Sequence, residues 1–497
     1  MFLLLITLVF VLTAFYFYLK SPYTYWKKLG VPGPEVNSWL GHIPSVWHNK
    51  QNYVYEFADI YRKYRFKHPF VGIFVLRQPQ LVIIDPKIVK QVLVQKFKCF
   101  RDNYFSDPVT KQTDKLLGRN PFNLKGDEWK EKRGELVPGF SVVKIKSQYP
   151  IIEDACKKLV AYITAQQNPI DVRDLTARYT STVVSSCIYG VDAESFSEEN
   201  PLLLDRARNI MSEKMWTQLK IISFFPFLNK FYKTCYVDSV SEEFFLKLMK
   251  DACIHRESSH EKRNDYLEYL IDLQQRKGST RLDTAANGLT FFLDGFDTSS
   301  IFMFFVLYEL SKHPEIQLRL REEIEHYFLL HNGKLSYDFV EEMPYLDMVI
   351  NETLRMHPAI PVVAKLVTED VELPLADNKT VQIKKGTTVN IPIYCFHNDE
   401  AYYTNPEIFD PERFSPETGG TREFKENCVF LPFSDGPRIC LGMRFALAQV
   451  KRGIVEIVKN FELTLNEKTK EPLKYQRKAF LFISSVENEV LIDFKKI

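Results

Sequence analysis

The chain carries almost no excess of charge of either sign. Its 497 residues include 65 Lys and Arg against 63 Asp and Glu, which gives a formal net charge of +2. A protein that binds nucleic acid usually shows a strong basic excess or a basic stripe, so we expect no nucleic-acid partner. The remaining composition, 45% apolar and 26% charged, is ordinary for a globular protein and allows a large core.

Cysteine is sparse, and glycine-rich nucleotide motifs are missing. The eight cysteines contain no C-x-x-C pair, which a structural zinc site usually needs. Disulfide scaffolds are short and dense in cysteine, so we expect reduced thiols in a cytosol-facing domain. No G-x-G-x-x-G follows a predicted strand, and the chain therefore has no dinucleotide-binding motif of its own.

The N-terminus carries a near-continuous apolar run. The segment Phe2 to Leu19 is apolar except for two threonines, and its length of about 18 residues reaches the lower limit for a membrane-spanning helix. A cleaved signal peptide, the alternative, would have basic residues before the run and a small-residue cleavage site after it. Here Lys20, Lys27 and Lys28 follow the run instead. By the positive-inside rule, we expect residues 1–20 to be an uncleaved membrane anchor with the rest of the chain in the cytosol.

A short proline-rich segment separates this anchor from the body. Val31-Pro32-Gly33-Pro34 stops any helix and stiffens the chain. We interpret residues 21–34 as a linker with a hinge that fixes how the body sits on the membrane; a plain linker is the alternative. Residues 35–497 contain no internal repeat, low-complexity segment or long linker, so we expect one large domain.

The hydrophobic periodicity predicts that this domain is mainly α with small β-sheets. Apolar residues recur with helical spacing in 127–136, 151–165, 284–313, 314–328, 337–356 and 440–461. Strand patterns occupy 71–76, 80–84, 380–383, 480–485 and 490–494. Asp85-Pro86 is a plausible helix start and predicts a helix to about Val94.

An apolar patch from Ile221 to Leu228 is interrupted by a proline. Packing in the core explains such a run. A loop between helices that dips into the membrane, where apolar substrates would gain access, explains it as well. The sequence leaves both interpretations open.

One cysteine stands in an unusual setting. Cys440 follows the loop Phe433-Ser434-Asp435-Gly436-Pro437-Arg438-Ile439 and comes at the start of a predicted helix. A helix N-terminus carries partial positive charge and free N–H groups. Arg438 adds charge two residues away, so we expect a lowered pKa for the Cys440 thiol. A thiolate in this place is a nucleophile, a redox sensor or a metal ligand, and these features alone do not choose among them.

The loop resembles F-x-x-G-x-R-x-C-x-G, the signature of the cytochrome P450 superfamily, at every fixed position. The resemblance implies a P450 fold and a haem b cofactor whose iron is axially ligated by Cys440. Such a thiolate pushes electron density onto the iron and favours O–O cleavage. The resemblance also implies that Arg438 pairs with a haem propionate and that Phe433 packs beside the sulfur.

Two further motifs appear where that family has them. Glu352 and Arg355 match E-x-x-R, whose spacing puts both charges on one helical face. An exposed surface pair is the alternative, whereas the resemblance implies a buried network with Arg413. Trp129 and Arg133 match W-x-x-x-R, and the resemblance implies that both contact a haem propionate.

The segment from Asp294 to Ser300 resembles the oxygen-activating pattern [A/G]-G-x-[D/E]-T-[T/S]. The resemblance implies that Gly295 leaves room for oxygen and that Thr298 donates a hydrogen bond to the bound dioxygen. Asp297 would help to relay protons. A threonine bonded to its own helix is the alternative at any single position. Four motifs in the family's order favour the resemblance.

Two positions depart from the family pattern. Asp294 stands where the family usually has a small residue over the haem edge. One branch joins a glutamate there to a haem methyl, so an ester through Asp294 is a hypothesis, and an acid satisfied by a neighbour is the alternative. Lys365 falls where many relatives carry an arginine that faces a propionate. A lysine supplies charge but not the bidentate fork.

The resemblance implies a membrane-bound monooxygenase similar to the arthropod branch that handles foreign compounds and hormones. One atom of O₂ enters a lipophilic substrate, and the other leaves as water. The electrons would come from NADPH through NADPH–cytochrome reductase at the endoplasmic reticulum membrane, with cytochrome b5 as a further candidate partner. Lys130 and Lys132 are candidates for the reductase-docking face, and solvated surface lysines are the alternative.

Two rival functions belong to other classes. One is a haem-thiolate isomerase or dehydratase that rearranges peroxides without a reductase. Such relatives tend to lose the acid–alcohol pair, which this chain keeps as Asp297-Thr298. The other is a non-catalytic haem sensor or carrier, which has no need for a complete set of oxygen-activation residues.

The substrate pocket is expected to draw on five mostly apolar segments. Their composition favours a lipophilic small molecule such as a xenobiotic, insecticide, hormone or lipid. The segments are Arg101 to Asn123, the Phe224 area, Phe291 to Thr298, Pro361 to Lys365 and Phe480 to Ser484.

Overall fold

The computed structural model describes residues 2–231, 235–259, 263–479 and 483–497. The longer helices are α1 (Phe2–Lys20), α4 (Tyr53–Tyr64), α6 (Gly126–Leu136), α7 (Val142–Ala165), α8 (Val172–Ile188), α9 (Leu202–Ile210), α10 (Glu213–Phe224), α11 (Ser239–Ser259), α12 (Tyr266–Lys277), α13 (Arg281–Lys312), α14 (Pro314–Leu330), α16 (Pro344–Met356) and α19 (Met443–Asn460). Short helices are α2 (Tyr25–Lys28), α3 (Pro44–Trp47), α5 (Pro86–Lys90), α15 (Tyr337–Glu341), α17 (Ile393–His397) and α18 (Arg422–Glu426).

The strands form three small sheets beside the helices. A five-stranded sheet has the order β1-β2-β8-β5-β3, a three-stranded sheet the order β4-β10-β9, and β6 pairs with β7. The mainly α fold class with small β-sheets is confirmed. The strands are β1 (Phe70–Val75), β2 (Gln78–Ile83), β3 (Asp102–Asn103), β4 (Ile170–Asp171), β5 (Val363–Leu366), β6 (Val371–Pro374), β7 (Thr380–Ile383), β8 (Thr388–Ile391), β9 (Phe461–Leu465) and β10 (Leu491–Lys496).

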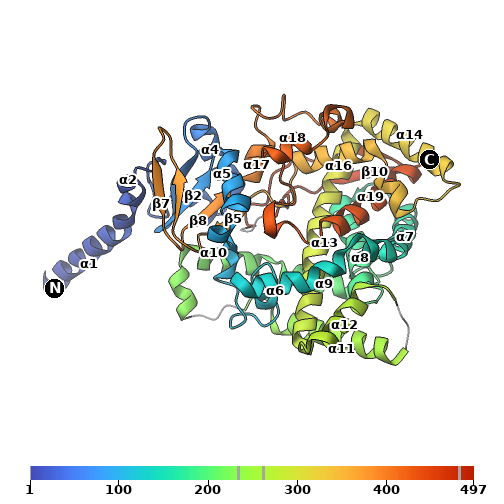
Figure 1. Cartoon of the computed structure of the whole chain (residues 1–497), viewed down its shortest axis with the longest axis horizontal. Helices are drawn as coiled ribbons and strands as arrows, with labels where there is room; N and C mark the ends of the chain where they lie inside the picture. The colour runs from blue at the N-terminus through green and yellow to red at the C-terminus, as the bar shows by residue number, and fades with distance from the viewer. Residues whose placement is uncertain (1, 232–234, 260–262, 480–482) are drawn as a thin grey trace.

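The N-terminal apolar helix stands apart from the body, next to the five-stranded sheet (Figure 1). By length and composition, the segment Leu5–Lys28 is able to cross a membrane, and none of its apolar window is buried. Among the described residues, α13 also passes this test, but 67% of its window is buried. The apolar α1 is thus suited to anchor the chain in a membrane, whereas α13 is the central helix of the core.

The segment after this helix is tied to β1. The Trp26 side chain is 3% exposed, and its indole N–H donates to the Ile73 carbonyl at 2.9 Å. The Gly72 N–H donates to the Pro32 carbonyl at 2.8 Å. A Cβ added at Gly72 would come within 2.3 Å of the Trp26 ring, so only glycine allows this approach. These contacts join residues 26–32 to β1; that the segment is a hinge that fixes how the body sits on the membrane stays a prediction.

Several boundaries differ from the sequence predictions for local reasons. The helix predicted over 337–356 is split into α15 and α16, because Pro344 occupies the first turn of a new helix. The helix predicted from Cys440 begins at Met443, so the cysteine lies in the preceding loop. Helix α7 begins at Val142, upstream of the predicted 151, and runs through Pro150. The predicted helix over 85–94 ends at Lys90 and continues as a wider π turn.

The predicted strand over 480–485 is not formed in its described part, because residues 483–485 have no strand partner. Residues 480–482 lie outside the described residues. The strand predicted over 490–494 is β10, and the one predicted over 380–383 is β7. The apolar patch from Ile221 to Leu228 is divided: Phe224 is fully buried, whereas Phe227 is 56% exposed.

Helix α13 is stabilised by a capping box at its N-terminus and by the helices that pack along it. Thr280 and Asp283 form a capping box, in which each side chain accepts from the backbone N–H of the other. The helix then packs along α8 and contacts α11, α19 and α16. In Figure 1 it runs through the middle of the helical part of the molecule. It therefore carries the residues Asp294 to Ser300 into the interior.

A buried ion network lies next to α13. Glu352 and Arg355 of α16 are both fully buried and form a bidentate pair with distances of 2.7 and 2.8 Å. The Arg413 Nε donates to Glu352 at 3.2 Å, and the Asp410 N–H donates to it at 3.0 Å. The prediction of a buried network with Arg413 is confirmed. Arg355 also donates to the His397 carbonyl at 2.9 Å.

His397 connects this network to the segment before Cys440. The side chain is fully buried. Its Nε2 accepts from the Leu431 N–H at 2.7 Å, so Nδ1 carries the proton and donates to the Arg355 carbonyl at 3.2 Å. Burial, followed by the charge of Arg355, lowers the pKa of His397 to about 3. The imidazole is therefore neutral in the folded protein at physiological pH.

Removing the charge of Glu352 is expected to destabilise the fold. Glu352→Gln leaves Arg355 and Arg413 buried beside an uncharged partner, which costs about 3–5 kcal/mol of unfolding free energy. The matched control is Glu426→Gln, since Glu426 pairs with Arg422 on the surface and should change stability little. Urea unfolding of both variants checks this. Equal stability of the two variants would show that the buried network is not needed.

The neutral His397 is expected to make the fold acid-sensitive. Its pKa is about 3 in the folded chain and about 6.5 when unfolded. Its contribution to stability is thus fully present above pH 6.5 and is lost as the pH falls toward 3, by about 1.4 kcal/mol per pH unit. His397→Gln keeps an acceptor for the Leu431 N–H but cannot take up this proton. Unfolding measured across that range should therefore depend less on pH in the variant; identical slopes would refute the assignment.

Candidate active site

The loop that carries Cys440 is closed by its own backbone. The Cys440 N–H donates to the Phe433 carbonyl at 3.0 Å, and the Ile439 N–H donates to the Gly436 carbonyl at 3.0 Å. Ser434 has φ +63° and Gly436 has φ +71°, both in the left-handed region that favours glycine. The loop thus turns sharply at these residues, and Cys440 lies back beside Phe433.

Gly436 also lies against a neighbouring turn. A Cβ added there would come within 2.0 Å of the Leu93 carbonyl oxygen, in the π turn Gln91–Gln95. The sequence signature requires glycine at this position for two reasons, the positive φ and the close backbone approach.

The Cys440 thiol faces a large internal cavity of about 440 Å³. Burial raises the pKa of the Cys440 thiol to about 11. The N–H groups of Gly442 and Met443 and the charge of Arg133 lower the pKa, while Asp294 raises it. The predicted lowering of the thiol pKa is wrong in its net direction: the N–H groups at the start of the helix lower the pKa, but burial raises it more.

The predicted residues Arg438 and Trp129 lie together at one edge of the cavity. The Arg438 guanidinium stacks over the Trp129 ring, 4.2 Å from its centroid. It donates to the Leu124 carbonyl at 2.8 Å, and Asp102 lies 3.5 Å away. Its buried Nε has no hydrogen-bond partner within the described part of the chain. Burial lowers the pKa of Arg438 to about 9.

Two further cations line the same cavity. Arg133 donates to the Ile439 carbonyl at 2.7 Å, so this arginine supports the Cys440 loop directly. Lys365 is 1% exposed, and its ammonium donates to the side-chain oxygen of Asn103 at 2.9 Å. Burial, followed by the charge of Arg438, holds the pKa of Lys365 well below its usual range. The edge of the cavity is thus lined by three basic side chains, with Asp102 as the acid near Arg438.

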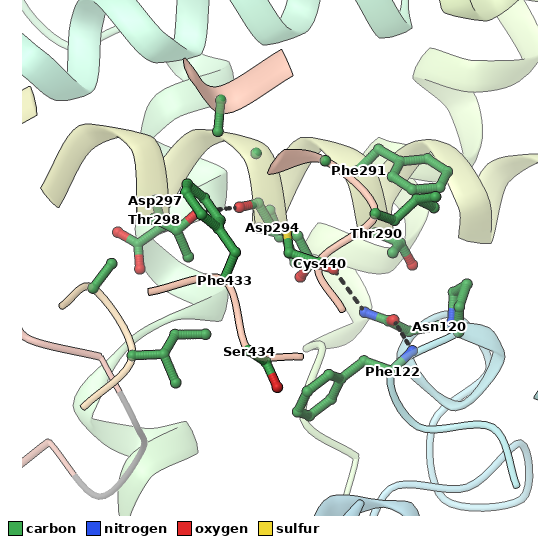
Figure 2. Close-up of a pocket in the computed structure, with 18 of the residues that line it drawn as sticks. Asn120, Phe122, Thr290, Phe291, Asp294, Asp297, Thr298, Phe433, Ser434 and Cys440 are labelled. Atoms are coloured by element: carbon green, nitrogen blue, oxygen red, sulfur yellow. Dashed lines mark hydrogen bonds between the residues drawn. The ribbon is translucent and has the colours of Figure 1, made fainter. Parts of the chain in front are cut away.

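Helix α13 forms another wall of the cavity. Figure 2 shows Thr290, Asp294, Asp297 and Thr298 along this helix, close to the loop with Phe433, Ser434 and Cys440. The Thr298 hydroxyl donates to the Asp294 carbonyl at 2.6 Å. Its proton is therefore engaged by its own helix, and toward the cavity it offers lone pairs that accept hydrogen bonds. The predicted donation to dioxygen would require this bond to open.

The two acids on this wall, Asp294 and Asp297, have different neighbours, and burial raises the pKa of both. Burial raises the pKa of Asp297 to about 6, while the charges of Arg173 and Arg208 lower it. Burial raises the pKa of Asp294 to about 7, and the Asn120 amide at 3.5 Å is its hydrogen-bond partner. Both carboxyl groups can therefore take up and release a proton near neutral pH.

Gly295 lines the cavity with its backbone. A Cβ added there would touch Val184 of α8 at an ordinary contact distance of 3.6 Å. Its carbonyl accepts from the Gln449 amide at 3.3 Å, and the same amide donates to the Ser299 hydroxyl at 2.8 Å. That Gly295 makes room for oxygen stays a prediction.

Four of the five predicted pocket segments contribute described lining residues. The Phe224 area does not line the cavity, because Phe224 is fully buried against Trp47. Met215 and Leu219, earlier in α10, take its place. The lining is mainly apolar and includes Phe105, Val109, Leu117, Phe122, Met211, Phe291, Ile360, Val362 and Ile483.

Sequence reasoning missed Thr290, which lines the cavity, and Gln449, which donates a hydrogen bond to Ser299 of α13. Asn103 and Asn120 also line the cavity; they lie within a predicted pocket segment, but nothing in the sequence singled them out. No motif marks these four residues, because they come from different elements that only the fold brings together. Of the candidate docking lysines, Lys130 is exposed, whereas Lys132 is paired with Glu135 at 2.7 Å.

The comparisons with known proteins agree with this geometry. The family model for Cytochrome P450 matches residues 31–490. The chain is 34% identical to Probable cytochrome P450 28a5 of Drosophila melanogaster, over 96% of this chain and 95% of that protein. It is 37% identical to Probable cytochrome P450 309a1 of the same species, over 90% of each. It is 33% identical to Cytochrome P450 6j1 of Blattella germanica, over 94% and 92%. The chain therefore belongs to the cytochrome P450 family, the haem-thiolate monooxygenases.

Proposed function

We propose that Cys440 supplies the thiolate that ligates the haem iron, and that the cavity between its loop and α13 is where a lipophilic substrate is oxidised. The position of Cys440 carries this proposal. Two cysteines line the cavity: Cys187 is 1% exposed within α8, and Cys440 lies on the loop with the signature spacing. A metal that binds a thiol deprotonates it outright, which would offset the raised pKa of Cys440.

The charges at the edge of the cavity fit haem as the cofactor. Arg438, Lys365 and Arg133 are cations, and Asp102 is the nearby acid. The buried Nε of Arg438 lacks a partner among the described residues, and the buried Lys365 amino group donates to the Asn103 amide oxygen rather than to an acid. The two propionates of a haem would supply the missing acceptors and charge. Arg438, Trp129, Arg133 and Lys365 would then hold the cofactor, with Phe433 beside the sulfur.

Haem supplies the binding and reductive activation of O₂ that amino-acid side chains cannot provide. The chain contributes an apolar pocket that excludes water and a short proton path on α13. Asp297 has a pKa of about 6, so it exchanges protons readily near neutral pH. Thr298 presents hydroxyl lone pairs that can accept a hydrogen bond and position a proton donor.

The electrons are proposed to come from NADPH through NADPH–cytochrome reductase, with cytochrome b5 as a second donor. The chain shows no dinucleotide motif of its own, and P450 enzymes in general receive electrons from a redox partner. The apolar α1 would hold residues 1–20 in the endoplasmic reticulum membrane, with residues 21–34 as the hinge and residues 35–497 as the catalytic domain in the cytosol. The exposed Lys130 is a candidate for the docking face.

The rival functions make different demands on O₂ and NADPH. An isomerase or dehydratase consumes neither, and a haem sensor or carrier turns over no substrate. Consumption of both, when the haem-loaded chain is mixed with reductase and a lipophilic substrate, supports the monooxygenase. Absence of consumption by chain that binds CO normally would favour the rivals.

Removal of the Thr298 hydroxyl is expected to uncouple O₂ consumption from product formation. In Thr298→Ala, the proton donor would no longer be positioned by the hydroxyl. The amount of product per NADPH should therefore fall by about tenfold or more, while hydrogen peroxide rises. Thr298→Ser keeps the hydroxyl, so its ratio of product to NADPH should be close to that of the unmodified chain. Parallel measurement of NADPH, product and peroxide checks this. Unchanged coupling in Thr298→Ala would remove Thr298 from the proton path.

A further inference from the structure

Asp294 is an acid without a cation. It lines the cavity on α13, and none of the described ion pairs involves it. The cations that line the same cavity are Arg133, Lys365 and Arg438, which are anchored to the Cys440 loop, to Asn103 and to the backbone near Leu124. The charges of Arg173 and Arg208 act on Asp297 rather than on Asp294. A carboxyl group in an apolar cavity calls for a donor or a cation to balance it.

Asn120 satisfies this demand only in part. The oxygen of its side chain accepts from the Phe122 N–H at 2.7 Å, which turns the amide nitrogen toward Asp294. The resulting contact to one carboxyl oxygen is long, at 3.5 Å. Figure 2 shows both contacts at the end of the loop that carries Asn120 and Phe122. The second carboxyl oxygen is left for another donor.

Thr290 provides an independent sign of a polar ligand. It stands one helical turn before Asp294 and therefore on the same face of α13. It is 2% exposed, it lines the cavity, and its hydroxyl has no hydrogen-bond partner among the described residues. A threonine in a helix commonly bonds to the carbonyl four residues earlier, as Thr298 does. The buried Thr290 hydroxyl has no such partner among the described residues, and its residue forms part of the cavity wall.

We propose that Asp294 and Thr290 form a subsite for the protonated amine of a lipophilic substrate. This inference rests on the proposed function and adds a substrate class to it. An ammonium N–H donates to the Asp294 carboxylate, and the Thr290 hydroxyl accepts a second bond or solvates the charge. Phe105 and Phe122, whose rings stack 6.4 Å apart, line the same cavity and offer aromatic faces to a cation. The apolar lining holds the hydrocarbon part.

An ester between Asp294 and the haem would remove this subsite, because an ester carries no charge. Extraction of the haem into acidified organic solvent separates the two cases. Complete release leaves the carboxyl group free, as the proposal requires. Haem that stays with the chain in the unmodified protein, but is released from Asp294→Asn, would overturn it.

The direct test compares a pair of probes that differ in charge alone. The probes are 1-methyl-4-phenylpiperidine, a cation at neutral pH, and its carbon analogue 1-methyl-4-phenylcyclohexane. Dissociation constants are measured from the Soret shift of the full-length, haem-loaded chain in detergent. Asp294→Asn should weaken binding of the amine by about tenfold or more and leave the hydrocarbon within about twofold, because a charge-assisted bond is lost from one probe only. Asp294→Glu should restore most of the amine affinity.

Thr290→Val provides a second arm that keeps the acid. Thr290→Val should weaken binding of the amine severalfold and leave binding of the hydrocarbon unchanged. If Asp294→Asn fails to load haem, this variant still tests the subsite. Equal effects of the variants on both probes, or no effect on either, would overturn the subsite. A red shift that marks ligation of the iron by the probe nitrogen would do the same. A normal spectrum of the reduced CO complex in these samples keeps such a failure separate from a failure of the proposed function.

Discussion

Hydrogen bonds to backbone groups hold the loop from Phe433 to Cys440 and the segment just before it. The Cys440 N–H is bonded to the Phe433 carbonyl, the Arg133 side chain grips the Ile439 carbonyl, and His397 accepts from Leu431 just upstream. Each partner comes from a different element, so the position of the sulfur depends on the packing of the whole domain. The buried pair of Glu352 and Arg355 also helps to position this segment, because Arg355 donates to the carbonyl of His397.

Charge is divided sharply across the cavity. The cations Arg438, Lys365 and Arg133 lie at the edge next to the Cys440 loop, whereas the acids Asp294 and Asp297 lie on α13. In an apolar surrounding, each group carries a cost until a partner balances it. The cofactor's propionates would balance the cations, and a substrate amine would balance Asp294. Two ligands of opposite charge would therefore fit the two sides of the cavity.

The sequence identified the residues of the motifs correctly, but it did not predict their burial or their pKa values. The cysteine loop, the segment around Thr298 and the pair of Glu352 and Arg355 follow from spacing, because a helical or loop spacing determines which side chains share a face. The pKa of Cys440 was predicted with the wrong sign, since burial depends on residues far away in the chain. Thr290 carries no signature, because a buried hydroxyl without a hydrogen-bond partner can be recognised only in the folded structure.

The central claim is that Cys440 holds the haem iron through its sulfur. The absorption spectrum of the reduced, CO-bound chain tests it most directly, recorded beside Cys440→Ala and, as a control for loss of any thiol on the cavity wall, Cys187→Ala. We expect a strongly red-shifted Soret band in the unmodified chain and in Cys187→Ala, and its loss in Cys440→Ala. A red-shifted band that persists in folded, haem-loaded Cys440→Ala would contradict the account.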